Sequence, residues 1–178
     1  MEQKGEIITL VDQRDNIIGG EEKIKVHREG LLHRAFSIFV FDDKMNLLIQ
    51  QRNPNKYHSG GKWANTTCGH QRYGEGLSES AHRRLQEEMG FYTELDDVFS
   101  FHYKIELDND MTENEIDHVF IGYYNQSVSP NPMEVSAYLW VKVDNLLKDI
   151  EENPDKFAYW FRKALPMVAD YLKDNELL

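Results

Sequence analysis

The chain has 178 residues, of which 40% are hydrophobic and 12% aromatic, a composition that suits one soluble globular domain with a sizeable core. Its net charge of −11 excludes a general nucleic-acid binder, because affinity for a phosphate backbone needs a basic face. A small phosphorylated substrate stays possible, because it needs only a few local cations.

The absence of targeting signals favours a cytoplasmic protein. No stretch approaches the ~18 apolar residues of a membrane span, and the polar residues 1–5 lack the apolar centre of a signal peptide. The single cysteine, Cys68, excludes an internal disulfide framework and should stay a thiol in a reducing compartment. We therefore expect no nucleic-acid partner, no membrane partner, and a monomer or weak dimer.

The first part of the chain is predicted to form strands. Apolar, β-branched and aromatic residues are separated by short turns rich in Asp and Asn, a pattern typical of hairpins. The four predicted strands cover residues 7–11, 17–18, 35–41 and 47–52. Residues 53–62 contain Pro, Ser and two glycines and are predicted to form a loop.

One well-defined helix is predicted in the middle of the chain, over residues 77–89. Ser78 can serve as its cap or lie in its first turn, and Gly90 is a natural stop. Further strands are predicted at residues 98–107, 116–124 and 137–143, with a polar loop at 125–132. A short helix at 146–151 and an amphipathic helix at 157–172, broken or kinked at Pro166, complete the chain.

This order of elements predicts the fold class. Strands outnumber helices and the helices interrupt them, which favours an α+β domain of α/β/α sandwich type. We find no repeat, low-complexity segment or linker, so residues 1–178 are interpreted as a single domain.

The central helix carries groups that suit a metal–phosphate site. Glu75, Glu87 and Glu88 offer oxygens of the kind that Mg²⁺ or Mn²⁺ uses beside phosphate-bearing substrates. Arg83 and Arg84 could pair with these glutamates or bind phosphate directly. Taken alone, such a helix is more often a solvated surface.

A second set of metal ligands is spread through the chain. His27, His33 and His70 offer imidazole nitrogens, while Glu113 and Glu115 share one face if their segment is extended. Such a set could hold Mn²⁺, Mg²⁺ or Zn²⁺. A single histidine is more often a surface or hydrogen-bonded residue, and we keep that interpretation for His58, His82, His102 and His118.

Cys68 is a candidate proton donor or acceptor. A lone cysteine is more often a small buried hydrophobic residue, yet a thiol with a pKa of ~8.5 can be tuned toward neutral pH. Placed opposite a carboxylic acid such as Glu115, it would form an acid–base pair on two faces of a substrate.

The spacing around the central helix resembles the Nudix box. That motif has Gly, five residues, Glu, seven residues, Arg-Glu, an aliphatic residue, any residue, Glu-Glu, any residue, Gly and an aliphatic residue. Here it begins at Gly69 and Glu75 and ends at Phe91. Arg84 stands where the motif has its first glutamate of the helix, which removes a carboxylate that Nudix hydrolases use for metal.

Most of the chain resembles one branch of the Nudix superfamily, the type I isopentenyl-diphosphate isomerases. In these enzymes an arginine at the position of Arg84 is usual. An aromatic C-terminal segment like the one around Trp160 is also shared. The other matching segments are residues 10–12, 25–27, 32–37, 63–70 and 113–115.

The resemblance implies a Nudix fold, in which a mixed sheet lies between helices, and it implies specific roles. One divalent metal, Mn²⁺ or Zn²⁺, would be held by His27, His33, His70, Glu113 and Glu115. The catalytic groups would be Cys68 and Glu115, with Tyr103 assisting proton delivery. Glu88 would bind a second ion, Mg²⁺, carried by the diphosphate. The substrate would be contacted by Lys23, Arg52, Lys56, Arg84 and Trp160.

Moving the double bond of isopentenyl diphosphate suits these residue types. The reaction protonates an alkene at one end and removes a proton at the other, through a tertiary carbocation that water must not reach. A tryptophan face is the best aromatic partner for such a cation, although without the resemblance Trp160 could equally be packing in the core.

Two other functions stay open. A Nudix pyrophosphohydrolase would cleave a nucleoside or other diphosphate, and a binding module would only hold its ligand. Arg84, together with the joint presence of Cys68, Tyr103 and Glu115, favours the isomerase over both.

Overall fold

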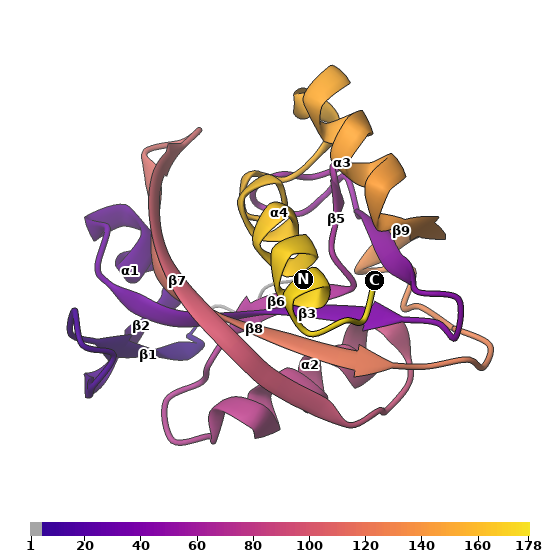
Figure 1. The fold of residues 1–178 in the computed structure, drawn as a ribbon. Helices are drawn as coiled ribbons and strands as arrows, with labels where there is room; N and C mark the ends of the chain where they lie inside the picture. The colour runs from indigo at the N-terminus through magenta and orange to yellow at the C-terminus, as the bar shows by residue number, and fades with distance from the viewer. Residues whose placement is uncertain (1–4) are drawn as a thin grey trace.

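The computed structural model describes residues 5–178; residues 1–4, part of the segment used to argue against a signal peptide, lie outside the described residues. Residues 5–178 form one mixed sheet of nine strands, with helix α2 on one face and helix α4 on the other (Figure 1). This arrangement confirms the predicted α+β class with a mixed sheet between helices. Among the same residues, no helix is long and apolar enough to cross a membrane.

The strands follow the predicted order closely. The described strands are β1 (Ile7–Val11), β2 (Ile17–Glu22), β3 (His33–Phe41), β4 (Asn46–Arg52), β5 (Trp63–Ala64), β6 (Thr67–His70), β7 (Leu95–Leu107), β8 (Met111–Tyr123) and β9 (Val135–Lys142). The helices are α1 (Lys23–Glu29), α2 (Leu77–Met89), α3 (Val143–Glu152), the short 3₁₀ helix η1 (Pro154–Lys156) and α4 (Tyr159–Asp174).

Strand β3 is central, because it pairs with β8 in parallel and with β6 antiparallel. Alternate residues of β3 point to opposite faces of the sheet. Phe36, Ile38 and Val40 pack toward α2, whereas Phe39 and Phe41 join the core beneath α4. His33 and Ser37 are an even number of positions from Phe39 and Phe41, so these two polar residues lie on the face that α4 covers.

Helix α2 lies close to β6 because Gly69 carries no side chain. A Cβ atom there would sit 2.8 Å from the Phe36 ring and 3.3 Å from Cγ of Arg84. The helix has its predicted bounds and ends at Gly90, whose φ of 76° is left-handed. Ser78 lies in the first turn, and the cap position is Gly76, whose N–H donates to the Glu79 carboxylate at 3.3 Å.

The structure corrects the predicted elements at several places. Helix α1 was not predicted, and neither were the short strands β5 and β6. Strand β8 begins at Met111 rather than 116, so Glu113 and Glu115 lie on a strand. Helix α4 does not break at Pro166. Pro166 lies on the exposed side of the helix, so water can hydrogen-bond the carbonyl group that loses its helical partner.

Candidate active site and metal centre

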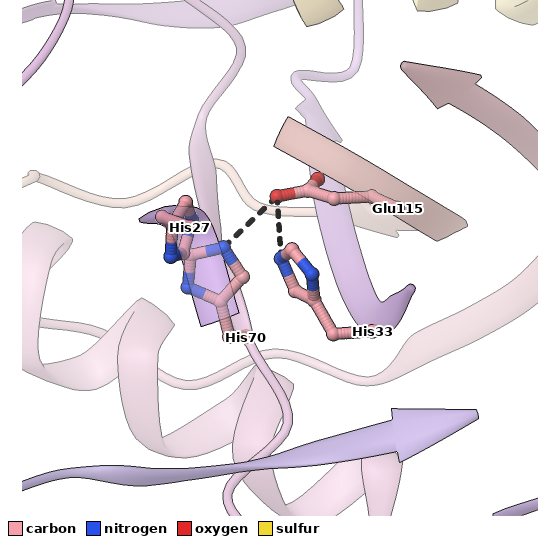
Figure 2. A group of neighbouring side chains, drawn as sticks. All are labelled: His27, His33, His70 and Glu115. Atoms are coloured by element: carbon pink, nitrogen blue, oxygen red, sulfur yellow. Dashed lines mark hydrogen bonds and ion pairs between the residues drawn. The ribbon is translucent and has the colours of Figure 1, made fainter. Parts of the chain in front are cut away.

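Four side chains from four different elements meet on the α4 side of the sheet. They are His27 of α1, His33 at the start of β3, His70 at the end of β6 and Glu115 of β8, and their ligand atoms all lie within 4.8 Å of one another. Strand register explains the meeting, because His33 is aligned with Glu115 while Ala35 is aligned with His70. Figure 2 shows the three imidazoles gathered about the Glu115 carboxylate.

The hydrogen bonds of these histidines leave nitrogen lone pairs facing one another. Nδ1 of His27 donates to the Lys23 carbonyl at 2.7 Å, and Nδ1 of His33 donates to the Leu31 carbonyl at 2.9 Å. A carbonyl only accepts, so in the neutral rings both Nε2 atoms are acceptors. Nε2 of His27 is buried without a partner among the described residues, and Nε2 of His33 lies 3.2 Å from Oε1 of Glu115.

This arrangement fits a divalent cation. Buried acceptors that face one another are costly unless a proton or a metal lies between them. Burial lowers the pKa of His27 to about 4 and that of His70 to about 3, so both rings are neutral and able to ligate at pH 7. Burial alone would raise the pKa of Glu115, but the hydrogen bond from Nε2 of His70, 2.9 Å from its Oε1, helps to hold that pKa well below its ordinary value.

Glu113 lies next to this group but is not part of it. Oε2 of Glu113 accepts from the Tyr103 hydroxyl at 2.9 Å, and its Oε1 lies 3.2 Å from Nε2 of His58. The Tyr103 hydroxyl also donates to Oε2 of Glu115 at 2.7 Å. Burial together with Glu115 raises the pKa of Glu113 well above its ordinary value.

Cys68 lies on β6 directly across from Ser37 of β3. Its Sγ accepts a long contact from Nη1 of Arg52 at 3.7 Å. Burial raises the pKa of Cys68 to about 12, so the group is a thiol near neutral pH. The Ser37 hydroxyl donates to Asp117 at 2.7 Å, and the second oxygen of that buried carboxyl has no partner among the described residues.

Three of the four predicted phosphate-binding cations, Lys23, Lys56 and Arg84, are already paired with carboxylates, whereas Arg52 contacts Cys68 and the His58 carbonyl. Lys56 contacts Glu134 and lies 3.9 Å from Glu88, and Arg84 contacts Glu88 as well. Glu88 is 2% exposed and also accepts from the Gln50 amide at 2.7 Å. The opposite charges of Glu88 and Glu134 outweigh burial and raise the pKa of Arg84.

Trp160 of α4 closes the hydrophobic side. It is 3% exposed and its indole nitrogen donates to Asn65 at 3.0 Å, which fixes the plane of the ring. The Arg52 guanidinium lies 5.0 Å from the ring centre, and the His58 ring meets it edge-on at 5.8 Å.

These groups surround one pocket of about 310 Å³. The predicted site residues that line it are Lys23, Arg52, Lys56, Cys68, His70, Arg84, Glu88, Tyr103, Glu113, Glu115 and Trp160. His27 and His33 do not line it, because they lie behind His70 and Glu115 as buried partners.

Sequence reasoning missed several residues of this pocket. Asp117 follows Glu115 by two positions on a strand, so strand periodicity could have identified it. His58 was interpreted as an ordinary histidine, yet it lies in the pocket, where burial and Arg52 hold its pKa well below the usual range. Glu6 and Arg72 also line the pocket, and no motif pointed to them.

The arrangement combines a half-buried thiol, a buried carboxylate that is hydrogen-bonded to a phenol, an aromatic wall and a set of cations. It can bind an anionic group at the cationic end and exchange protons at two places beside an apolar group. Glu75, by contrast, pairs with Arg83 and Ser80 and does not line the pocket.

Comparison with known proteins agrees with this geometry. The NUDIX domain family matches residues 31–161. A Photorhabdus laumondii protein named isopentenyl-diphosphate Delta-isomerase 2 is 51% identical over 160 residues, covering 90% of this chain and 90% of that protein. A Serratia proteamaculans isopentenyl-diphosphate Delta-isomerase is 47% identical over 156 residues, covering 88% of this chain and 87% of the relative.

Solved structures support the fold. A Deinococcus radiodurans crystal structure aligns with a TM-score of 0.76 and 18% identity, covering 91% of this chain and 98% of the other. A MutT protein from Methanosarcina mazei aligns with a TM-score of 0.67 and 21% identity, covering 80% and 96%. With the sequence identities above, the chain carries a NUDIX domain and belongs to the isopentenyl-diphosphate Delta-isomerase family.

Proposed function

We propose that this chain converts isopentenyl diphosphate to dimethylallyl diphosphate by moving one carbon–carbon double bond, as a step of isoprenoid biosynthesis. The observation that carries the proposal is the pocket in which Cys68, Tyr103 and Glu115 share the walls with Trp160 and five cations. Relatives that bear the name of this activity, at 40–51% identity, support it.

Proton exchange is assigned to two groups. Cys68 would act at one end of the allylic unit, and Glu115 with Tyr103 at the other. One group adds a proton to the alkene and the other removes a proton from the carbocation, so the diphosphate is left intact. The Tyr103 hydroxyl, 2.7 Å from Glu115, would carry the proton between that carboxylate and the substrate.

The carbocation needs protection as well as proton transfer. Trp160 would present its ring to the positive carbon, an interaction worth about 2 kcal/mol in a desolvated site. Its hydrogen bond to Asn65 keeps the ring in place, so no reorientation is needed during the reaction. The pocket would also have to keep out water, which would otherwise capture the cation.

The metal assignments are part of the proposal. His27, His33, His70 and Glu115 would hold Mn²⁺ or Zn²⁺, with Glu113 joining after it loses its proton, and Glu88 would hold Mg²⁺ beside the diphosphate. When bound, these ions would stabilise the anionic form of Glu115 and neutralise charge on the diphosphate. Lys23, Arg52, Lys56 and Arg84 would bind the remaining phosphate oxygens.

The alternative is a Nudix pyrophosphohydrolase. Arg84 donates to Glu87 at 2.7 Å and also contacts Glu88, so a cation occupies both remaining glutamates at the end of the box. This pairing reduces the negative charge available to the several metal ions that diphosphate hydrolysis would use, and it favours isomerisation. We also propose that the chain works in a reducing cytoplasm, because Cys68 must remain a free thiol. We propose that it does so as a monomer or weak dimer.

NMR of the purified protein with isopentenyl diphosphate and Mg²⁺ in D₂O tests the proposal. We expect dimethylallyl diphosphate, deuterium in product and substrate, and unchanged phosphorus signals of the diphosphate. Release of phosphate would support the hydrolase, and no reaction by a folded, metal-loaded protein would overturn both activities.

A further inference from the structure

A carboxylate lies among the cations of the pocket without belonging to the Nudix box or to the histidine group. Glu6 precedes β1, and its carbonyl accepts from the Lys23 backbone N–H at 3.0 Å. The neighbouring Ile7 carbonyl accepts from the N–H of Tyr73 at 3.0 Å. Glu6 is therefore held between the first turn of α1 and the segment that follows His70.

The Glu6 side chain bridges two cations of the pocket wall. Its Oε1 accepts from Nε of Arg72 at 2.8 Å, and its Oε2 lies 3.4 Å from Nζ of Lys23. The side chains of Glu6 and Lys23 are only 16% and 13% exposed, and all three residues line the pocket. Burial would raise the pKa of Glu6, but Lys23 and Arg72 lower it to about 2, so the carboxylate is charged near neutral pH.

A negative group in this place opposes the binding of an anion. Lys23 is assigned to the substrate diphosphate, and its charge is already balanced by Glu6. Two carboxylate oxygens that join an ammonium and a guanidinium imitate two oxygens of a phosphate group. Bound diphosphate would therefore compete with Glu6 for the same two cations.

Arg72 has capacity left for a ligand. Its Nε is used by Glu6, and its Nη1 lies 3.7 Å from Glu75. Among the described residues, no hydrogen bond or ion pair is formed by its Nη2, and 34% of this pocket-lining side chain is exposed. A guanidinium in this state can first bind a phosphate oxygen through Nη2, and the carboxylate on Nε can then be displaced.

We propose that Arg72 is an additional diphosphate-binding residue and that Glu6 is a built-in counter-anion, which occupies Lys23 and Arg72 until the diphosphate displaces it. The inference rests on the proposed function for the chemical class of its ligand. Glu6 thus sets substrate affinity below the value that the cations alone would give.

Glu134 occupies a comparable place beside Lys56 and Arg84 at the other end of the cation set. Both of those cations also reach Glu88, the proposed Mg²⁺ residue, so a change at Glu134 would mix metal binding with phosphate binding. Glu6 has no such contact and gives the cleaner test.

The test is calorimetric binding of inorganic pyrophosphate, with excess Mg²⁺, to the full chain and its variants. Glu6→Gln keeps an oxygen that accepts from Arg72 but removes the charge, and we expect pyrophosphate to bind about 3- to 10-fold more tightly. Arg72→Gln should weaken binding by about 5- to 30-fold. In the double variant, the tightening caused by Glu6→Gln should shrink, because one of the two released cations is missing.

Two exposed residues of α1 provide matched controls: Glu29→Gln and Arg28→Gln make the same changes in net charge outside the pocket. They should leave the dissociation constant within about 2-fold. Thermal unfolding verifies that every variant is folded. If Glu6 has only a structural role, Glu6→Gln should bind pyrophosphate as tightly as the wild type or more weakly, and that result would overturn the inference. Unchanged pyrophosphate binding in Arg72→Gln would overturn it as well.

Turnover separates this inference from the proposed function. KM for isopentenyl diphosphate should follow the pyrophosphate affinities, with kcat little changed. If the wild type isomerises its substrate but the variants do not shift affinity, only the counter-anion is wrong. If affinities shift as expected while no isomerisation occurs, the proposed function is wrong and the counter-anion stands.

Discussion

Replacing Tyr103 by Phe removes one oxygen atom at the point where two buried carboxyl groups meet. The hydroxyl lies 2.9 Å from Glu113 and 2.7 Å from Glu115, and the residue is 7% exposed, so water cannot easily replace it. A hydrogen bond to a charged group contributes about 1.5–3 kcal/mol. If that contribution is needed in the transition state, kcat should fall by roughly 10- to 100-fold, with KM nearly unchanged.

The assay is the initial rate of dimethylallyl diphosphate formation by proton NMR, at metal content verified by elemental analysis. Tyr159→Phe is the matched control, because its ring lies 5.8 Å from the Tyr103 ring and it does not line the pocket. The control should keep its rate within about 2-fold, as expected when no transition-state contact is lost. Full kcat in Tyr103→Phe, with normal metal content, would refute a role for the phenol in proton delivery.

Four further outcomes are expected. Cys68→Ala should lower kcat by about 10²–10⁴-fold without unfolding the chain, and retained turnover would contradict its acid–base role. Trp160→Leu should be at least about 10-fold slower than Trp160→Phe, which keeps an aromatic face; equal rates would count against cation stabilisation. His27→Ala should reduce bound Mn²⁺ or Zn²⁺ in equilibrium dialysis while pyrophosphate binding persists, and undiminished metal binding would exclude this ligand. Glu6→Gln should lower the free energy of unfolding by about 1 kcal/mol at pH 7, after allowance for solvent screening. A carboxyl group whose pKa is lowered by folding stabilises the folded state fully only above its unfolded pKa, so this difference should disappear as the pH falls from 4.5 to about 2. A difference in stability that does not change with pH would argue against the ion pairs.

Much of the site was predictable because its chemistry lies in short segments with fixed spacing. Cys68, His70 and the box from Gly69 to Phe91 occupy one continuous stretch, so the pattern was visible without the fold. The two-residue spacing of Glu113 and Glu115 also pointed to one face of a strand, and β8 has that form. The structure adds that Tyr103 of β7 is aligned with Glu115 and bonds to both carboxyl groups.

Other parts depend on contacts that no local pattern records. Helix α1 has seven residues and is capped by Glu22, a residue type that rarely caps helices, so its local signal was weak. His58 lies in an irregular loop, and its place beside Trp160 depends on packing across 102 positions of the chain. Glu6 could be recognised as a pocket residue only from its contacts with Lys23 of α1 and with Arg72, both of which are distant from it in the sequence.

The parallel pairing of β3 with β8 has a consequence for which sequence changes the chain can tolerate. His33 and Glu115 are 82 positions apart and meet only because the two strands share one register. Losing one residue between Glu115 and His118 would turn every following side chain to the opposite face, which would direct His118 into the core beneath α4 and remove Val119 from that core. Length changes should therefore be confined to the loops, such as residues 125–132, and homologues should differ in length there rather than in the strands.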